Sequence, residues 1–103
     1  MSTDRVTSHG ASAQALQVRV RGRVQGVGYR DACVRRAHIL GIRGWVCNRV
    51  DGSVELLLQG APDVLAQMLA WLRDGVRYAR VDSVETAALE PAGLQGFERL
   101  PTR

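Results

Sequence analysis

The 103-residue chain lacks lysine altogether, and aromatic residues make up only 5% of it. No apolar run approaches the ~18 residues of a membrane-spanning helix, so no such helix is expected. The stretch 1–14 also lacks the apolar core of a signal peptide. These absences favour a disordered leader over residues 1–14 and a cytoplasmic protein.

Residues suited to disulfide or metal chemistry are also scarce. A small secreted disulfide scaffold would contain more cysteines than Cys33 and Cys47, so both are expected to be buried thiols. His9 and His38 stand apart from each other and from the cysteines, without the spacing of a zinc site. The sequence therefore predicts neither a metal nor another cofactor.

The charged residues that are present favour an anionic partner. Arginine supplies all of the 14 basic residues, which exceed the 10 acidic residues and give a net charge of +4. Such a balance suits nucleic acid, a membrane surface or a small phosphate compound. Composition alone does not choose among them.

Hydrophobic periodicity changes several times along the chain, which predicts alternating strands and helices. Strict alternation at 16–23 indicates a half-buried strand, whereas 31–40 has helical spacing and ends at Gly41. The dipeptide Asp51-Gly52 is a strong hairpin signal. The other predicted elements are strands at 43–50, 53–59 and 78–89, a helix from Pro62 to Gly75, and a short last strand around Phe97.

The order of these elements predicts the fold class. It is that of an α+β, ferredoxin-like sandwich, βαββαβ with a short terminal strand. Two helices would pack on one face of an antiparallel sheet, within a single domain at 15–103. The apolar phase slips between Val81 and Val84, which predicts a β-bulge in the strand that contains them.

The other face of the sheet is expected to be open, with Arg19, Arg21 and Arg23 in a row along it. This row is interpreted either as a solvated face or as a nucleic-acid-binding surface. Ferredoxin-like RNA-binding domains stack bases on aromatic side chains, but the strand at 53–59 has none. The solvated face is therefore the favoured interpretation.

The segment GRVQGVGYR, residues 22–30, places three glycines and an arginine between a strand and a helix. Glycine permits positive φ, and successive amides in such a turn can converge on an anion beside a helix N-terminus. Arg30 can bind a phosphate through its planar guanidinium. The segment fits neither G-x-G-x-x-G nor the Walker motif. Spacing alone therefore leaves an anion site and a plain turn as alternatives.

Two polar residues have more than one interpretation. Asn48 is unusual for a strand, and it is expected either to bond to the hairpin backbone or to position a water molecule or a phosphate. Asp31 follows Arg30 directly, and it is expected to cap the helix or to orient the guanidinium.

Three segments in combination resemble the acylphosphatase family: GRVQGVGYR at 22–30, LGIRGWVCNRVDGSVE at 40–55 and ARVDSVE at 79–85. The resemblance covers nearly all of residues 16–100. It implies a ferredoxin-like fold and hydrolysis of the carboxyl–phosphate bond of small acyl phosphates without a metal. Partners would then be small molecules rather than nucleic acid or membranes, and the protein would be a monomer.

The resemblance also implies roles for matching residues. Arg30 matches a phosphate-binding arginine, and Asn48 matches an asparagine that orients the attacking water. Both would be catalytic. The positions that match the phosphate-binding loop, which Arg30 completes, are Val24, Gln25, Gly26, Val27, Gly28 and Tyr29.

Two other functions stay open at the level of sequence. The first is a non-catalytic module that binds phosphate or nucleic acid. The second is a domain specific for carbamoyl phosphate, as the similar domain of hydrogenase-maturation carbamoyl transferases suggests. Retention of both Arg30 and Asn48 favours hydrolysis over a non-catalytic module.

Overall fold

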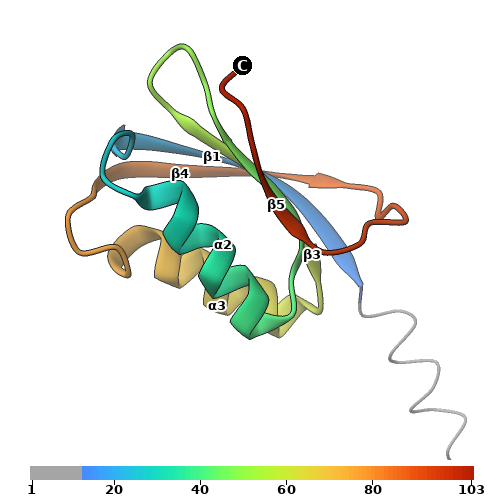
Figure 1. Cartoon of the computed structure of the whole chain (residues 1–103). Helices are drawn as coiled ribbons and strands as arrows, with labels where there is room; N and C mark the ends of the chain where they lie inside the picture. The colour runs from blue at the N-terminus through green and yellow to red at the C-terminus, as the bar shows by residue number, and fades with distance from the viewer. Residues whose placement is uncertain (1–12) are drawn as a thin grey trace, which may run out of the picture.

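The computed structural model describes residues 13–103, which form one sheet and two helices (Figure 1). Residues 1–12, and with them most of the expected leader, lie outside the described part. The first strand begins at Gln14, two residues before its predicted start. The elements are β1 (Gln14–Arg23), α2 (Tyr29–Leu40), β2 (Arg43–Asn48), β3 (Val54–Gly60), α3 (Pro62–Asp74), β4 (Arg80–Leu89) and β5 (Phe97–Leu100).

The sheet has the strand order β4-β1-β3-β2-β5, and both helices cover the same face of it (Figure 1). The four longer strands pair antiparallel, as predicted, but β5 pairs parallel to β2, so the expectation of a wholly antiparallel sheet is wrong. The segment between β4 and β5 reverses the chain direction. Because β2 already runs opposite to β4, β5 must run parallel to β2.

The core lies between the helices and the sheet, and its composition confirms the predicted periodicity. Val18 and Val20 of β1 and Leu56 and Leu58 of β3 are fully buried, whereas Leu16 is partly buried against the same core. The helices contribute Tyr29, Cys33 and Ala37 from α2 and Leu65, Met68 and Leu72 from α3. Cys33 and Cys47 are both buried and free, and burial raises the pKa of the Cys33 thiol.

The predicted bulge is present in β4. Arg21 pairs with Ser83 and Gly22 with Val81, so Asp82 has no opposite residue in β1. Gly22 has a φ of 137°, and a Cβ at this position would collide with the backbone carbonyl of Arg80. Glycine is thus required where β1 bends into the loop before α2.

Candidate functional site

The loop between β1 and α2 has the backbone geometry that its glycines predict. Gly26 and Gly28 have φ angles of 77° and 78°, both in the left-handed region. Gly28 is the N-cap of α2, and within the described chain no side chain caps this helix. The first turn of α2 therefore presents backbone N–H groups and the positive end of the helix dipole at the loop.

The side chain of Gln25 fastens this loop to the β2–β3 hairpin. Its Nε2 donates hydrogen bonds to the carbonyl oxygens of Arg49 and Ser53, each at 2.8 Å. The loop and the hairpin are thereby held together although they are distant in sequence. The Gln25 side chain is committed to this contact, so only its backbone is left for the anion-binding role.

The side chains at both ends of the loop are buried in the core. Val24 and Tyr29 are each 1% exposed. The Tyr29 hydroxyl donates to the carbonyl of Leu72 at 2.8 Å, and burial raises the pKa of this phenol, so it stays protonated. These contacts anchor the start of α2 to the end of α3.

Arg30 lies in the first turn of α2, which begins two residues earlier than predicted. Its Nη1 donates to the carbonyl oxygen of Leu100 in β5 at 3.2 Å. The backbone carbonyl thus orients the guanidinium without neutralising its charge, and the remaining donors are available to an anion.

Asn48 is the last residue of β2 and is 8% exposed. Its side-chain Oδ1 is buried and has no hydrogen-bond partner among residues 13–103. The hairpin turn is closed instead by the backbone bond from Arg49 N to Ser53 O, and Asp51 accepts from Ser53. A buried acceptor without a partner is costly, and such groups often mark a functional role.

A cavity of about 240 Å³ brings the main predicted residues together. Gly26 and Gly28 of the loop, Arg30 and Asn48 all line it, whereas Gln25 and Val27 are not among the lining residues. The lining residues are Val24, Gly26, Gly28, Tyr29, Arg30, Asp31, Asn48 and Arg99. A concave site with two guanidinium groups and helix N–H groups is suited to a small phosphate compound.

Comparison with known proteins identifies the family. The family model described as acylphosphatase matches residues 16–99. The chain belongs to the acylphosphatase family. The chain is 56% identical over 86 residues to an acylphosphatase of Polaromonas naphthalenivorans, covering 82% of this chain and 85% of that one. It is 52% identical over 98 residues to acylphosphatase 1 of Ralstonia nicotianae, covering 92% and 95% respectively.

A solved acylphosphatase from Coxiella burnetii has the same architecture. It superposes with a TM-score of 0.86 at 30% identity, over 91% of this chain and 99% of the other. The ferredoxin-like fold predicted from the order of elements is thus confirmed.

One arginine that lines the cavity of this acylphosphatase-family chain is not among the site residues predicted from the sequence. Arg99 of β5 lines the cavity, and its Nη1 lies 2.9 Å from Oδ1 of Asp31. Asp31 therefore pairs with Arg99 rather than capping α2 or orienting Arg30. The parallel pairing of β5 with β2 brings Arg99 to this place, and no local pattern in the sequence signals that pairing.

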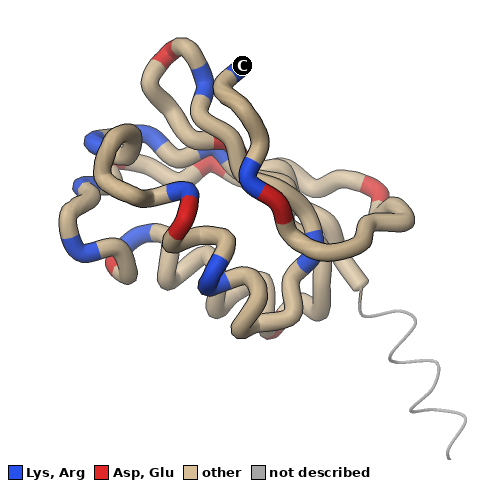
Figure 2. Tube along the Cα trace, in the orientation of Figure 1, with Lys and Arg blue, Asp and Glu red and all other residues tan. Residues whose placement is uncertain are grey.

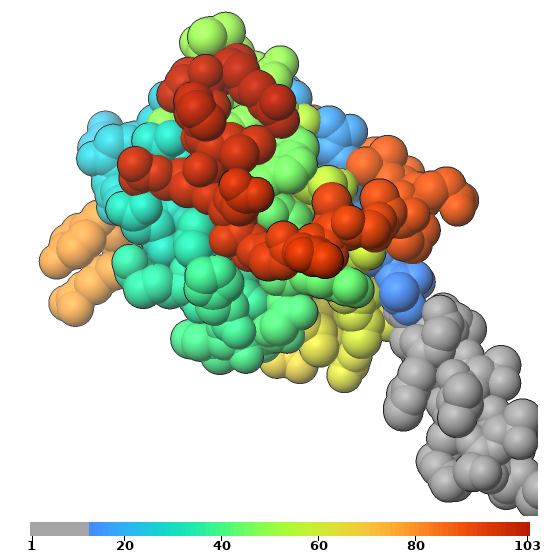
Figure 3. All heavy atoms as spheres, turned by 45° about the vertical axis from the view of Figure 1, so that its right-hand side comes forward, coloured from blue at the N-terminus to red at the C-terminus, as the bar shows by residue number. Residues whose placement is uncertain are grey.

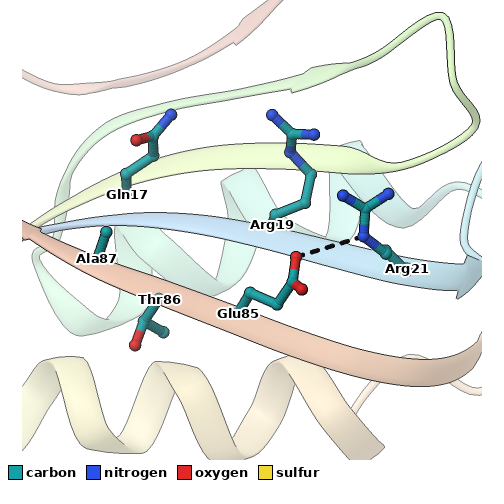
Figure 4. Close-up of a pocket in the computed structure, with 6 residues that line it drawn as sticks. All are labelled: Gln17, Arg19, Arg21, Glu85, Thr86 and Ala87. Atoms are coloured by element: carbon teal, nitrogen blue, oxygen red, sulfur yellow. Dashed lines mark hydrogen bonds and ion pairs between the residues drawn. The ribbon is translucent and has the colours of Figure 1, made fainter.

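The open face of the sheet contains a different hollow, of about 270 Å³, away from the glycine loop (Figure 4). Arg19 and Arg21 lie on it, 3.6 and 3.5 Å from Oδ2 of Asp51, and Arg21 also pairs with Glu85 at 3.3 Å. Nearby carboxylates thus partly offset the charges of Arg19 and Arg21.

Asp51 on this face provides a test by pH. Hydrogen bonds from Ser53, and then the nearby guanidinium groups of Arg21 and Arg19, lower the pKa of Asp51 to about 2. A carboxylate whose pKa is depressed on folding contributes stability above its unfolded pKa of ~3.9, and loses it as the pH falls toward 2. We expect Asp51→Asn to lower the thermal midpoint at pH 7, with a smaller difference from wild type at pH 2. An equal difference at both pH values would contradict this assignment.

Within residues 13–103, no group of three or more His, Cys, Asp or Glu side chains is arranged to hold a metal ion. Neither described helix is long and apolar enough to cross a membrane.

Proposed function

We propose that this protein hydrolyses the carboxyl–phosphate bond of small acyl phosphates to a carboxylate and inorganic phosphate. Membership of the acylphosphatase family supports the reaction. The observation that carries the proposal is the cavity that Arg30 and Asn48 both line, because the buried Oδ1 of Asn48 has no hydrogen-bond partner within residues 13–103. A cation for the phosphoryl group and an acceptor for a water hydrogen are the two groups that such a hydrolysis requires.

The phosphoryl group would bind to the loop and to Arg30. N–H groups between Val24 and Arg30 donate to its oxygens, and the positive end of α2 favours its charge. The guanidinium of Arg30 donates to the same group while Leu100 holds it in place. These hydrogen bonds stabilise the negative charge on the three equatorial oxygens of the phosphoryl group. In a loose phosphoryl-transfer transition state, the charge is spread over these oxygens.

Asn48 would position the attacking water. Its Oδ1 accepts a hydrogen from the water, and the amide group is fixed by burial at the end of β2. The water oxygen forms a bond to phosphorus as the bond from phosphorus to the carboxylate oxygen breaks, and the carboxylate leaves with the electron pair. The water proton passes to a phosphate oxygen of the substrate.

No general acid is needed in this scheme, because the carboxylate is a good leaving group. Catalysis then rests on orientation and electrostatic stabilisation, which the loop, Arg30 and Asn48 supply. The scheme also uses no metal ion.

Hydrolysis of benzoyl phosphate, followed by ultraviolet absorbance, tests the proposed function. We expect turnover at the same rate before and after dialysis against EDTA, because arginine and backbone N–H groups supply the positive charge. Loss of activity with EDTA and recovery with added Mg²⁺ would contradict the metal-free mechanism. Tight binding of inorganic phosphate without any turnover would favour the non-catalytic module.

We also propose that the protein is a cytoplasmic monomer that acts on small molecules. Two buried free thiols suit a reducing compartment. The cavity, at about 240 Å³, is below the range of ~300–1,000 Å³ typical of sites for drug-sized ligands, which favours a compact substrate. Light scattering after gel filtration tests the monomer.

A further inference from the structure

Arg99 is a charged residue of the cavity to which the proposed hydrolysis assigns no role. It lies on β5 opposite Val46 of β2, where the C-terminal segment passes the start of α2 (Figure 3). Figure 2 shows basic and acidic positions adjacent both in the first turn of α2 and on β5. The ion pair between Arg99 and Asp31 joins these two elements at the cavity.

The two arginines of the cavity differ in their surroundings. Arg30 is half-buried and donates to the Leu100 carbonyl. Arg99 has a side chain that is 50% exposed, and its contact with Asp31 joins one of its nitrogens to one carboxylate oxygen. A guanidinium has five N–H donors, so this single contact holds the group while leaving donors for another anion.

The residues that line the cavity carry a net positive charge before any substrate binds. Its lining contains two guanidinium groups and one carboxylate, and the N-terminus of α2 adds positive potential. In the proposed function the phosphoryl group takes Arg30 and the loop amides. Arg99 has no contact with the phosphoryl group in this scheme, so its remaining donors are left for another part of the substrate.

We propose that Arg99 is a specificity-determining residue that binds a second anionic group, a carboxylate or phosphate on the acyl part of the substrate. This inference rests on the proposed function for the position of the phosphoryl group. Asp31 orients the guanidinium by its 2.9 Å contact. Because the cavity is small, the second anion must lie only a few bonds from the phosphoryl group, so short dianionic acyl phosphates are the favoured substrates.

Two stable phosphonates test the binding of a second anion without any turnover. 3-Phosphonopropionate carries a carboxylate where propylphosphonate has a methyl group, and the two are otherwise alike. Calorimetry on the wild-type protein should show that the carboxylated compound binds about three- to tenfold more tightly, as expected for a charged contact at a half-exposed site.

Variants assign that preference to Arg99. Arg99→Gln should reduce the preference for the carboxylated phosphonate to less than about twofold. Arg99→Lys should retain part of this preference, because the ammonium group keeps the charge but lacks the planar set of donors of a guanidinium. Arg73→Gln is the matched control. Arg73 is exposed in the last turn of α3, so this substitution removes the same charge at a distant site. An equal preference in wild type and Arg99→Gln, or no preference in wild type, overturns the inference.

Benzoyl phosphate separates this inference from the proposed function. If the wild-type protein hydrolyses it but has no preference between the phosphonates, the role of Arg99 is wrong and the hydrolysis stands. If the protein hydrolyses nothing but an Arg99-dependent preference is found, anion binding by Arg99 stands and the proposed reaction is wrong.

Discussion

Replacing Arg30 with alanine is expected to lower kcat/KM for benzoyl phosphate by about 1,000-fold or more, in line with the loss of an arginine that stabilises phosphoryl transfer. The guanidinium is the one charged group of the cavity that the mechanism places on the phosphoryl oxygens. Its loss should weaken binding as well as turnover, so affinity for inorganic phosphate should fall in the same variant.

Two further variants sharpen this test. Arg30→Lys keeps the charge but loses the planar fork and the geometry set by Leu100, so its activity should lie between those of wild type and Arg30→Ala. Arg35→Ala removes an exposed arginine from the same helix and should retain activity. Comparable activity in Arg30→Ala and wild type would refute the role of Arg30.

Asn48→Ala is expected to reduce kcat by about 100- to 1,000-fold with little change in affinity for phosphate. The side chain contributes the acceptor that orients water, whereas the loop and Arg30 hold the phosphoryl group. A large fall in phosphate affinity together with an unchanged kcat would show that Asn48 binds substrate rather than water.

The same substitution should leave the fold intact, which distinguishes a catalytic role from a structural one. Oδ1 of Asn48 has no hydrogen-bond partner among the residues that the structure describes, so its removal takes away a desolvation cost of ~1–3 kcal/mol and offsets the small void that alanine leaves. The backbone bond from Arg103 N to Asn48 O does not depend on the side chain. Urea denaturation should therefore give a free energy of unfolding no lower than that of wild type.

The fold was predictable because its hydrophobic pattern is local. Alternation at Val18 and Val20 placed β1, and the phase slip before Val84 located the bulge, since both depend on which side chains face the core. The start of α2 was less predictable. Tyr29 joins this helix with its ring in the core and its hydroxyl bonded to the Leu72 carbonyl, contacts that no local pattern reports.

The site was predictable only where the family motifs supply its residues. Arg30 and Asn48 are 18 positions apart, yet they line one cavity as the resemblance implies. Arg99 was missed because its place depends on the parallel addition of β5 at a sheet edge. The side-chain direction of Gln25 was also hidden, because the carbonyls of Arg49 and Ser53 become its neighbours only after the hairpin docks.

The hydrogen bonds that hold the loop and Arg30 in place tolerate substitution of the residues that accept them. Gln25 and Arg30 both donate to main-chain carbonyls, those of Arg49, Ser53 and Leu100. Every amino acid provides such a carbonyl, so these three positions can change identity while each tether persists. Only the donor residues need to be retained, and the hairpin and β5 can therefore diverge between relatives without loosening the loop.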